Sequence, residues 1–76
     1  MTQPTDFRTT DTMLSAFLIA RGHPLRGLDG PRGRREFMFD PEAEADRAEY
    51  FADGLVSGRK MAGAFRDLKS ALFASA

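Results

Sequence analysis

The segment that most constrains this chain is residues 11–21, DTMLSAFLIAR, because as a helix it is apolar on almost every side. Residues that start and stop helices mark its two ends. Asp11 is a favoured N-cap residue, Gly22 suits the left-handed conformation that closes a helix, and Pro24 blocks further helix. We therefore predict a short helix that lies inside the core of the protein.

The apolar stretch within this helix, Met13–Ala20, is too short to be a membrane span, which needs about 20 residues. One strip of the helix is less apolar than the rest and carries Thr12, Ser15 and Ile19. We expect this strip to face water or the polar edge of another element. The remaining surface of the helix must be covered by other parts of the fold.

Length and charge limit the remaining classes of protein. A chain of 76 residues is long enough for one domain, which buries only about 60% of its unfolded surface. The 11 basic and 11 acidic residues cancel, which argues against a general nucleic-acid coat and a polybasic membrane anchor. The absence of cysteine excludes disulfides and thiolate metal sites, and the polar start lacks a secretion signal. We expect a cytoplasmic protein.

A β-hairpin is predicted after the first helix. It consists of a strand at residues 25–28, a turn at 29–33 and a strand at 34–39. Phe37 and Phe39 alternate with Glu36 and Met38, so the two phenylalanines share one face of the second strand. Because a two-stranded hairpin is marginally stable by itself, we expect this phenylalanine face to pack on the first helix.

Two further helices are predicted in the second half of the chain. Asp40 and Pro41 suit the start of the first of these, and Gly54 suits its end. We expect its inward face to carry Ala48, Phe51, Ala52 and Leu55, with Ala43 and Tyr50 at the margin. In the last helix the apolar residues follow one stripe, which consists of Met61, Phe65, Leu68 and Leu72. Gly63 within that helix indicates a fraying end or the close approach of another backbone.

The predicted fold class is therefore α+β: a helix, a two-stranded hairpin and two helices form a single domain over residues 7–73. Residues 1–6 are predicted to be a flexible tail, and 74–76 a frayed C-terminus. Between the tail and the first helix, residues 7–10 are expected to be extended, with Phe7 against that helix. The basic last helix is assigned to the core rather than to a membrane surface.

Several short motifs resemble a family of short bacterial and phage domains of unknown function. They are FRTTD at 7–11, LSAFL at 14–18, GH at 22–23, FMF at 37–39 and FRDLK at 65–69. In that family an aromatic pair such as Tyr-Trp often stands where this chain has Tyr50-Phe51. The resemblance implies a small α+β unit, frequently phage-associated, and it implies no particular activity.

The region from residue 21 to residue 35 contains five arginines and one acidic residue, Asp29. The arginines that belong to the predicted hairpin are Arg26, Arg32, Arg34 and Arg35. Guanidinium groups on such a hairpin can form bidentate hydrogen bonds with phosphates, which predicts contact with nucleic acid. The alternative is that these side chains are solvated or pair with the acidic helix that follows. The glycine spacing in this region does not match a dinucleotide-binding or P-loop motif.

The next region, residues 36–53, has a negative net charge, with seven acidic residues and one arginine. At helical spacing four of the acids share one face: Glu42, Asp46, Glu49 and Asp53. This face predicts a binding surface for a partner protein, whereas the simpler interpretation is a solvated helix face. The helical spacing does not suit calcium, which takes its ligands from a tight loop.

His23 is the single histidine, so one chain holds no multi-histidine metal site. A role as a general base lacks a nucleophile, because cysteine is absent and no serine lies in a nucleophile-elbow motif. We expect His23 instead to interact with the carbonyls at the end of the first helix. The sequence thus predicts a non-enzymatic protein without a cofactor or metal.

The leading hypothesis from sequence is a small accessory module that contacts nucleic acid through the Arg-rich hairpin. The alternative is a protein–protein adaptor or inhibitor that uses the acidic helix face or associates with itself through opposite charges. Both hypotheses rest on the separation of positive and negative charge within a neutral chain. They agree on a macromolecular partner and on the absence of a membrane partner, and they leave a homo-oligomer open.

Overall fold

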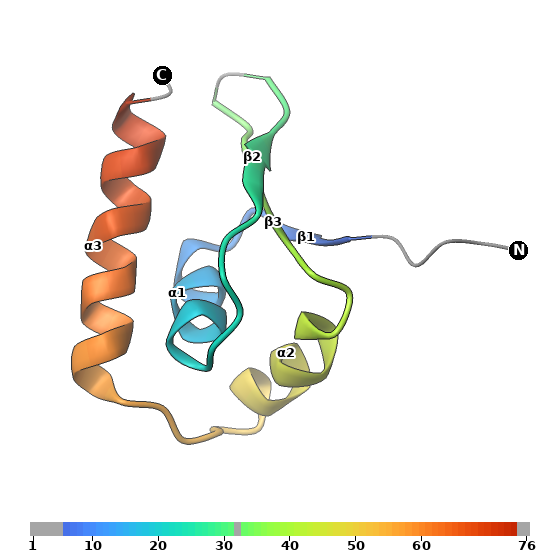
Figure 1. The fold of residues 1–76 in the computed structure, drawn as a ribbon, viewed down its shortest axis with the longest axis vertical. Helices are drawn as coiled ribbons and strands as arrows, with labels where there is room; N and C mark the ends of the chain where they lie inside the picture. The colour runs from blue at the N-terminus through green and yellow to red at the C-terminus, as the bar shows by residue number, and fades with distance from the viewer. Residues whose placement is uncertain (1–5, 32, 75–76) are drawn as a thin grey trace, which may run out of the picture.

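The computed structural model describes residues 6–31 and 33–74. Within these residues the chain forms three helices and a three-stranded antiparallel sheet (Figure 1). In chain order the elements are β1 (Phe7–Thr9), α1 (Thr12–Ala20), β2 (Gly27–Asp29), β3 (Glu36–Phe39), α2 (Ala43–Phe51) and α3 (Gly58–Ala74). The α+β class is confirmed.

The sheet differs from the predicted two-stranded hairpin, because the extended segment before α1 adds a third strand. β3 lies in the centre, antiparallel to β2 on one side and to β1 on the other. Phe7 is opposite Phe39 in β1, and Leu28 is opposite Phe37 in β2. The prediction of two strands was wrong because β3 has two edges, and pairing with β1 satisfies the backbone groups of the second edge.

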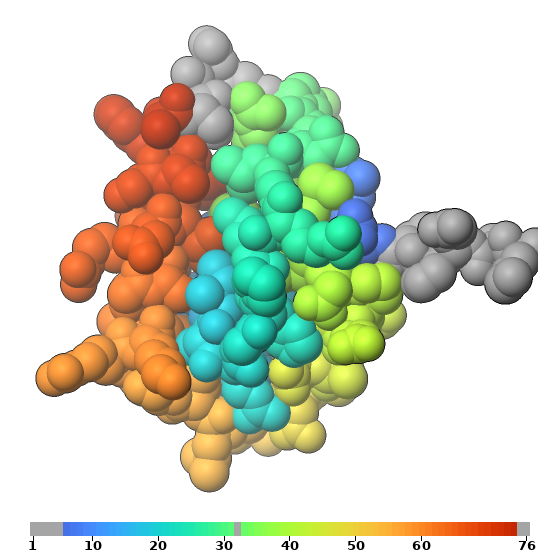
Figure 2. All heavy atoms as spheres, in the orientation of Figure 1, coloured from blue at the N-terminus to red at the C-terminus, as the bar shows by residue number. Residues whose placement is uncertain are grey.

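The phenylalanine face of β3 and the helix α1 meet in the core, as the sequence predicts. Phe37 and Phe39 are fully buried, and so are five consecutive residues of α1, Leu14–Leu18. α1 also contacts α3, α2 and β1, so it lies at the centre of the packed elements (Figures 1 and 2). Burial on nearly all sides explains why this short helix has no polar face.

The ends of α1 also follow the prediction, but its polar strip does not. The Asp11 carboxylate accepts a hydrogen bond from the Leu14 N–H at 3.0 Å, and Gly22 closes the helix with a φ of +105°. Ser15, which was expected to face water or a polar edge, is fully buried. Its hydroxyl donates to the Asp11 carbonyl at 2.8 Å, and this internal bond permits its burial.

The predicted inward face of α2 is wrong. Phe51 is 67% exposed and Leu55 is 88% exposed, whereas Ala43 is fully buried and the Tyr50 ring packs on Phe17 with 5.3 Å between centroids. Ala48 and Ala52, also expected inside, are exposed. α2 ends at Phe51 because the next turn leaves helical geometry: Asp53 has a φ of +61°. Residues beyond that point therefore no longer follow the helical face.

Asp40 was predicted to cap α2, but its carboxylate contacts His23 instead. The cap position belongs to Glu42, whose side chain makes no capping hydrogen bond. The backbone of residues 40–42 enters the helix through a turn, in which the Ala43 N–H donates to the Asp40 carbonyl at 3.1 Å. α2 is therefore positioned by contacts of its side chains with the end of α1.

The stripe on α3 packs as expected. Leu68 and Ala64 are buried, and Met61, Phe65 and Leu72 are partly buried against the core. Neither explanation for Gly63 holds, because it lies in mid-helix and a Cβ added there meets nothing within 4 Å. α3 includes Ala74, one of the residues predicted to fray, whereas 75–76 and tail residues 1–5 lie outside the described part of the chain. Over residues 6–31 and 33–74, no helix is long and apolar enough to cross a membrane.

Candidate functional site

Among the described residues, the arginines of the predicted basic hairpin do not form a single cluster. Arg26 donates a hydrogen bond to Asp6 at 3.1 Å, and Arg35 donates to the Gly30 carbonyl at 2.9 Å. Arg34 is exposed in the turn between β2 and β3. Arg32 lies outside the described residues. Two of the four arginines therefore make contacts within the protein itself.

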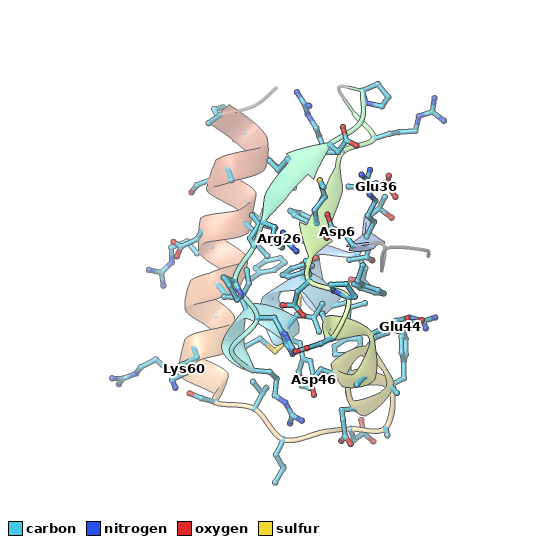
Figure 3. The ribbon with its side chains drawn as sticks, turned by 45° about the vertical axis from the view of Figure 1, so that its right-hand side comes forward. Asp6, Arg26, Glu36, Glu44, Asp46 and Lys60 are labelled. Atoms are coloured by element: carbon cyan, nitrogen blue, oxygen red, sulfur yellow. The ribbon has the colours of Figure 1, made fainter. Side chains whose placement is uncertain are left out.

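The sheet face opposite the core carries ion pairs between neighbouring strands. Arg8 of β1 reaches across β3 and donates to the Asp29 carboxylate of β2 at 2.5 Å, and its distance to Glu36 is 3.9 Å. The hydrogen bond from Arg8 lowers the pKa of Asp29. Figure 3 shows Arg26 and Asp6 together on the sheet side of the molecule, with Glu36 nearby. The positive charges of Arg8 and Arg26 on this face are thus compensated.

The four acids of the predicted partner-binding face are also separated. Glu42 and Glu49 are exposed on α2, but Asp46 turns toward the end of α1 and Asp53 lies beyond the end of α2. Exposed Glu44, which points away from the body of the molecule in Figure 3, adds to the acidic character of α2. The exposed surface of α2 and its end is therefore acidic, although Asp46 is not part of it.

His23 lies between two carboxylates that are distant in sequence. Its Nε2 is 2.6 Å from Asp46 of α2, and its Nδ1 is 3.3 Å from Asp40 in the β3–α2 connection. Its backbone N–H, as predicted, donates to a carbonyl of α1, that of Leu18, at 3.0 Å. The ring itself does not contact the helix carbonyls that we expected. No local spacing in the sequence links these three residues, so sequence reasoning missed the cluster.

Arg21 extends this cluster to the loop between α2 and α3. Its guanidinium donates to the Asp46 carboxylate at 3.0 Å and to the Leu55 carbonyl at 2.6 Å. It also lies 5.3 Å from the centroid of the Phe17 ring, one helical turn back. Arg21 therefore connects the end of α1 with α2 and with the backbone at Leu55.

The charges in this cluster stabilise one another. Burial lowers the pKa of His23, but hydrogen bonds with Asp46 and Asp40 outweigh it, and the pKa is raised. Burial raises the pKa of Asp46, but hydrogen bonds from His23 and Arg21 outweigh it, and this pKa is lowered. Because carboxylates engage both ring nitrogens, His23 is arranged as a link between elements rather than as a base open to a substrate. Among the described residues no group of acids and histidine has the arrangement of a metal site.

Two large apolar side chains, Phe51 at the end of α2 and Leu55 in the loop that follows, are exposed. The Phe51 and Tyr50 rings form a T-shaped pair with 5.2 Å between centroids, and the Arg47 guanidinium carbon lies 5.8 Å from the Phe51 centroid. Leu55 follows in the loop, and the exposed acids Glu49 and Asp53 lie beside these residues in the chain. We call Glu49, Phe51, Asp53 and Leu55 the α2-end surface. It combines two large exposed apolar side chains with two negative charges.

A second apolar surface lies along the C-terminal half of α3. A groove of about 520 Å³ is lined by Thr12, Phe65, Lys69, Leu72 and Phe73, and we call it the α3 groove. Phe73 is 86% exposed. The Lys69 ammonium lies 5.6 Å from the centroid of the Phe65 ring, so the groove has a positive charge at an apolar wall.

Comparisons of the chain with protein-family models, curated proteins and solved structures give no match. The resemblance to short bacterial and phage domains therefore stays a prediction. The candidate function rests on the geometry of the molecule itself.

Proposed function

We propose that the protein is a non-enzymatic module that binds another protein through the α2-end surface. The observation that carries this proposal is the exposure of Phe51 and Leu55, at 67% and 88%, on a backbone that Arg21 holds in place. The partner that fits this surface is a segment with an apolar side chain beside lysine or arginine. This is a specific form of the protein–protein adaptor that the sequence left open.

The apolar part of the surface supplies the free energy of binding. Covering a leucine or phenylalanine side chain fully is worth about 1.5–3 kcal/mol each. Ordering a flexible loop on binding would offset part of this gain. The Leu55 carbonyl accepts a hydrogen bond from Arg21 at 2.6 Å, and Arg21 is itself paired with Asp46. The loop is therefore ordered before a partner arrives, and less of the gain is lost.

The charge of the surface favours a basic partner. Glu49 and Asp53 belong to the surface, and exposed Glu42 and Glu44 lie farther along the same helix or at its start. Arg47, whose guanidinium lies near the Phe51 ring, is a cation within this region. Because acidic residues outnumber it, lysine or arginine in the partner is attracted and an acidic segment is repelled.

The nucleic-acid hypothesis has less support from the arrangement of the side chains. A phosphate-binding surface needs arginines whose donors point to a common site. Arg26 and Arg35 donate to Asp6 and to the Gly30 carbonyl, so their guanidinium groups are already engaged in different places. The α2-end surface, in contrast, lacks an apolar cover within the described chain.

Selection from a random peptide library displayed on phage tests the proposal with a defined probe. The immobilised full chain should enrich peptides in which a leucine or aromatic residue stands beside lysine or arginine. Isothermal titration with an enriched peptide should show at least about tenfold weaker binding to Leu55→Ser. Phe73→Ser removes an equally exposed apolar side chain elsewhere and should leave the affinity unchanged. Equal affinity for wild type and Leu55→Ser would overturn the proposal.

Titration with single- and double-stranded DNA and RNA at low salt tests the competing hypothesis. Phosphate contacts give an affinity that falls steeply with salt and that is lost when Arg32, Arg34 and Arg35 are changed to glutamate. We expect no such binding. Salt-dependent binding that requires these arginines, together with no enrichment of basic apolar peptides, would replace the proposed function with nucleic-acid recognition.

A further inference from the structure

We propose that the partner of the α2-end surface is the α3 groove of a second copy of this protein, so that copies associate head to tail. This inference names the partner of the surface described above and rests on the proposed function. It is carried by the match between the two surfaces in apolar character and in charge, and by their positions on the molecule.

The α3 groove has the properties expected of an acceptor for an exposed leucine or phenylalanine. Its volume of about 520 Å³ falls within the range of roughly 300–1,000 Å³ that is typical of ligand pockets. Phe65, Leu72 and Phe73 give it apolar walls, and Phe73 is 86% exposed. An apolar side chain from a second molecule would cover the part of Phe73 that now contacts water.

The charges around the two surfaces are opposite. Glu49 and Asp53 are exposed at the α2-end surface, and Lys69 lines the α3 groove. The C-terminal half of α3, which carries the groove, also exposes Arg66 beside Asp67. Glu49 and Asp53 of one copy are thus attracted to Lys69 of another.

The two surfaces lie at opposite ends of the molecule. Its longest axis measures 38 Å and is vertical in Figure 1, where the α2–α3 loop lies at the bottom and the C-terminal end of α3 at the top. Figure 2 gives the same arrangement with all atoms drawn. One molecule therefore cannot bring its own surfaces together. In a contact between unlike surfaces, each added copy keeps one unused α2-end surface or one unused groove, so association continues beyond a dimer to a chain or, where the rotation between copies closes, to a ring.

The size of the surfaces predicts weak association. A stable interface of standard size covers about 800 Å² on each partner, roughly a seventh of the 5324 Å² surface of this protein. A contact based on Leu55, Phe51 and one groove is smaller than this. Association is therefore expected at high micromolar concentrations rather than at nanomolar ones.

Sedimentation velocity of the full chain, from about 10 μM to about 1 mM, tests the inference. The wild type should sediment faster as concentration rises, with species larger than a dimer at the upper end. Leu55→Ser removes the leucine that enters the groove, and Phe73→Ser removes one wall of the groove. Each variant by itself should therefore remain monomeric. Both substitutions change exposed residues, and circular dichroism with urea unfolding verifies that each variant is folded.

The mixture of the two variants is the decisive sample. Leu55→Ser retains an intact groove, and Phe73→Ser retains Leu55. In an equimolar mixture, Leu55 of one variant can enter the groove of the other, so a one-to-one dimer should form and nothing larger. Monomers in this mixture, or a Phe73→Ser variant that still self-associates, would overturn the inference. A wild type that stays monomeric at 1 mM but binds basic apolar peptides through Leu55 would overturn it while leaving the proposed function in place.

Discussion

Two helices of this protein have the same length and opposite roles. α1 and α2 each contain nine residues. α1 buries five consecutive residues, Leu14–Leu18, whereas α2 buries only Ala43 and exposes Phe51. α1 is therefore held in place by the apolar surface that it buries on several sides. α2 owes its position to a few contacts at one side: Ala43, Tyr50 and the polar link from Asp46 to the end of α1.

The comparison shows how a small domain combines a stable core with an open binding surface. The core forms where α1 meets the sheet and α3, and Phe51 and Leu55 are not part of it. Because Ala43, Tyr50 and the polar link from Asp46 fix α2, Phe51 is left free to face outward. Stability and the proposed function thus belong to different helices, and substitutions can separate them.

Two phenylalanine substitutions, one in α1 and one in α2, should differ most in their effect on the free energy of unfolding. Phe17→Ala in α1 should lower the free energy of unfolding by about 3–5 kcal/mol, because Phe17 is 2% exposed and its removal leaves a cavity. Phe51→Ala in α2 should change it by no more than about 0.5 kcal/mol. Urea unfolding of both variants measures the difference. Similar losses for the two variants would mean that the helices do not differ in the way described.

A smaller loss is expected when the polar link of α2 is broken. Asp46→Asn removes the charge that pairs with Arg21 and His23, and it should cost about 1–3 kcal/mol. Glu49→Gln removes a charge from the exposed side of the same helix and serves as the control, with an expected change of no more than about 0.5 kcal/mol. If Asp46→Asn unfolds at the same urea concentration as wild type, α2 is held by other contacts.

The same link makes the stability depend on pH. The pKa of His23 is raised above 6.5 in the folded protein. Its contribution to stability is therefore complete below pH 6.5 and is lost as the pH rises through the pKa of the folded state. The pKa of Asp46 is lowered below 3.8 in the folded protein. Its contribution to stability is therefore complete above pH 3.8 and is lost as the pH falls through the pKa of the folded state. We therefore expect the His23–Asp46 pair to contribute most between about pH 4 and pH 6.5.

Urea unfolding at about pH 5.5 and about pH 8.5 measures this dependence. The wild type should be less stable at the higher pH, and His23→Gln should show a smaller difference between the two values. His23 faces Asp40 and Asp46, with Arg21 next to Asp46, so each of these charges contributes to the result. An identical pH dependence in wild type and His23→Gln would assign the effect to other groups.

Smaller effects are expected from substitutions of two glycines, Gly63 within α3 and Gly54 after α2. Gly63→Ala in α3 should stabilise the protein by about 0.4–1 kcal/mol, because an added Cβ meets nothing within 4 Å and alanine favours helix. Gly54→Ala after α2 should destabilise it, because an added Cβ would lie 2.8 Å from the Glu49 carbonyl oxygen. Thermal unfolding of the two variants should therefore shift in opposite directions, and shifts of the same sign would contradict this packing.

The features that the sequence predicts well are those with a local cause. The cap at Asp11, the left-handed Gly22 and the alternating Phe37 and Phe39 depend on near neighbours in the chain, and all are found in the structure. The third strand is a long-range pairing of β1 with β3, and no pattern within residues 7–10 specifies it. The strand also explains why Phe7 has a defined position beside the core.

The orientation of α2 was not predictable by the same reasoning. Counting apolar residues placed Phe51 and Leu55 inside, because helical periodicity identifies an apolar stripe but not whether other elements cover it. The side that faces the protein is fixed by Asp46, whose partners Arg21 and His23 are more than twenty residues away. The left-handed backbone at Asp53 then ends the periodicity on which the prediction depended.

Leu55→Ser allows stability and binding to be compared in a single variant. We predict that urea unfolding of this variant matches wild type within about 0.5 kcal/mol, because Leu55 is 88% exposed. We also predict that the variant binds the selected basic apolar peptide at least about tenfold more weakly. A variant that loses more than about 2 kcal/mol of stability while binding the peptide as tightly as wild type would show that Leu55 belongs to the core, and would contradict the account.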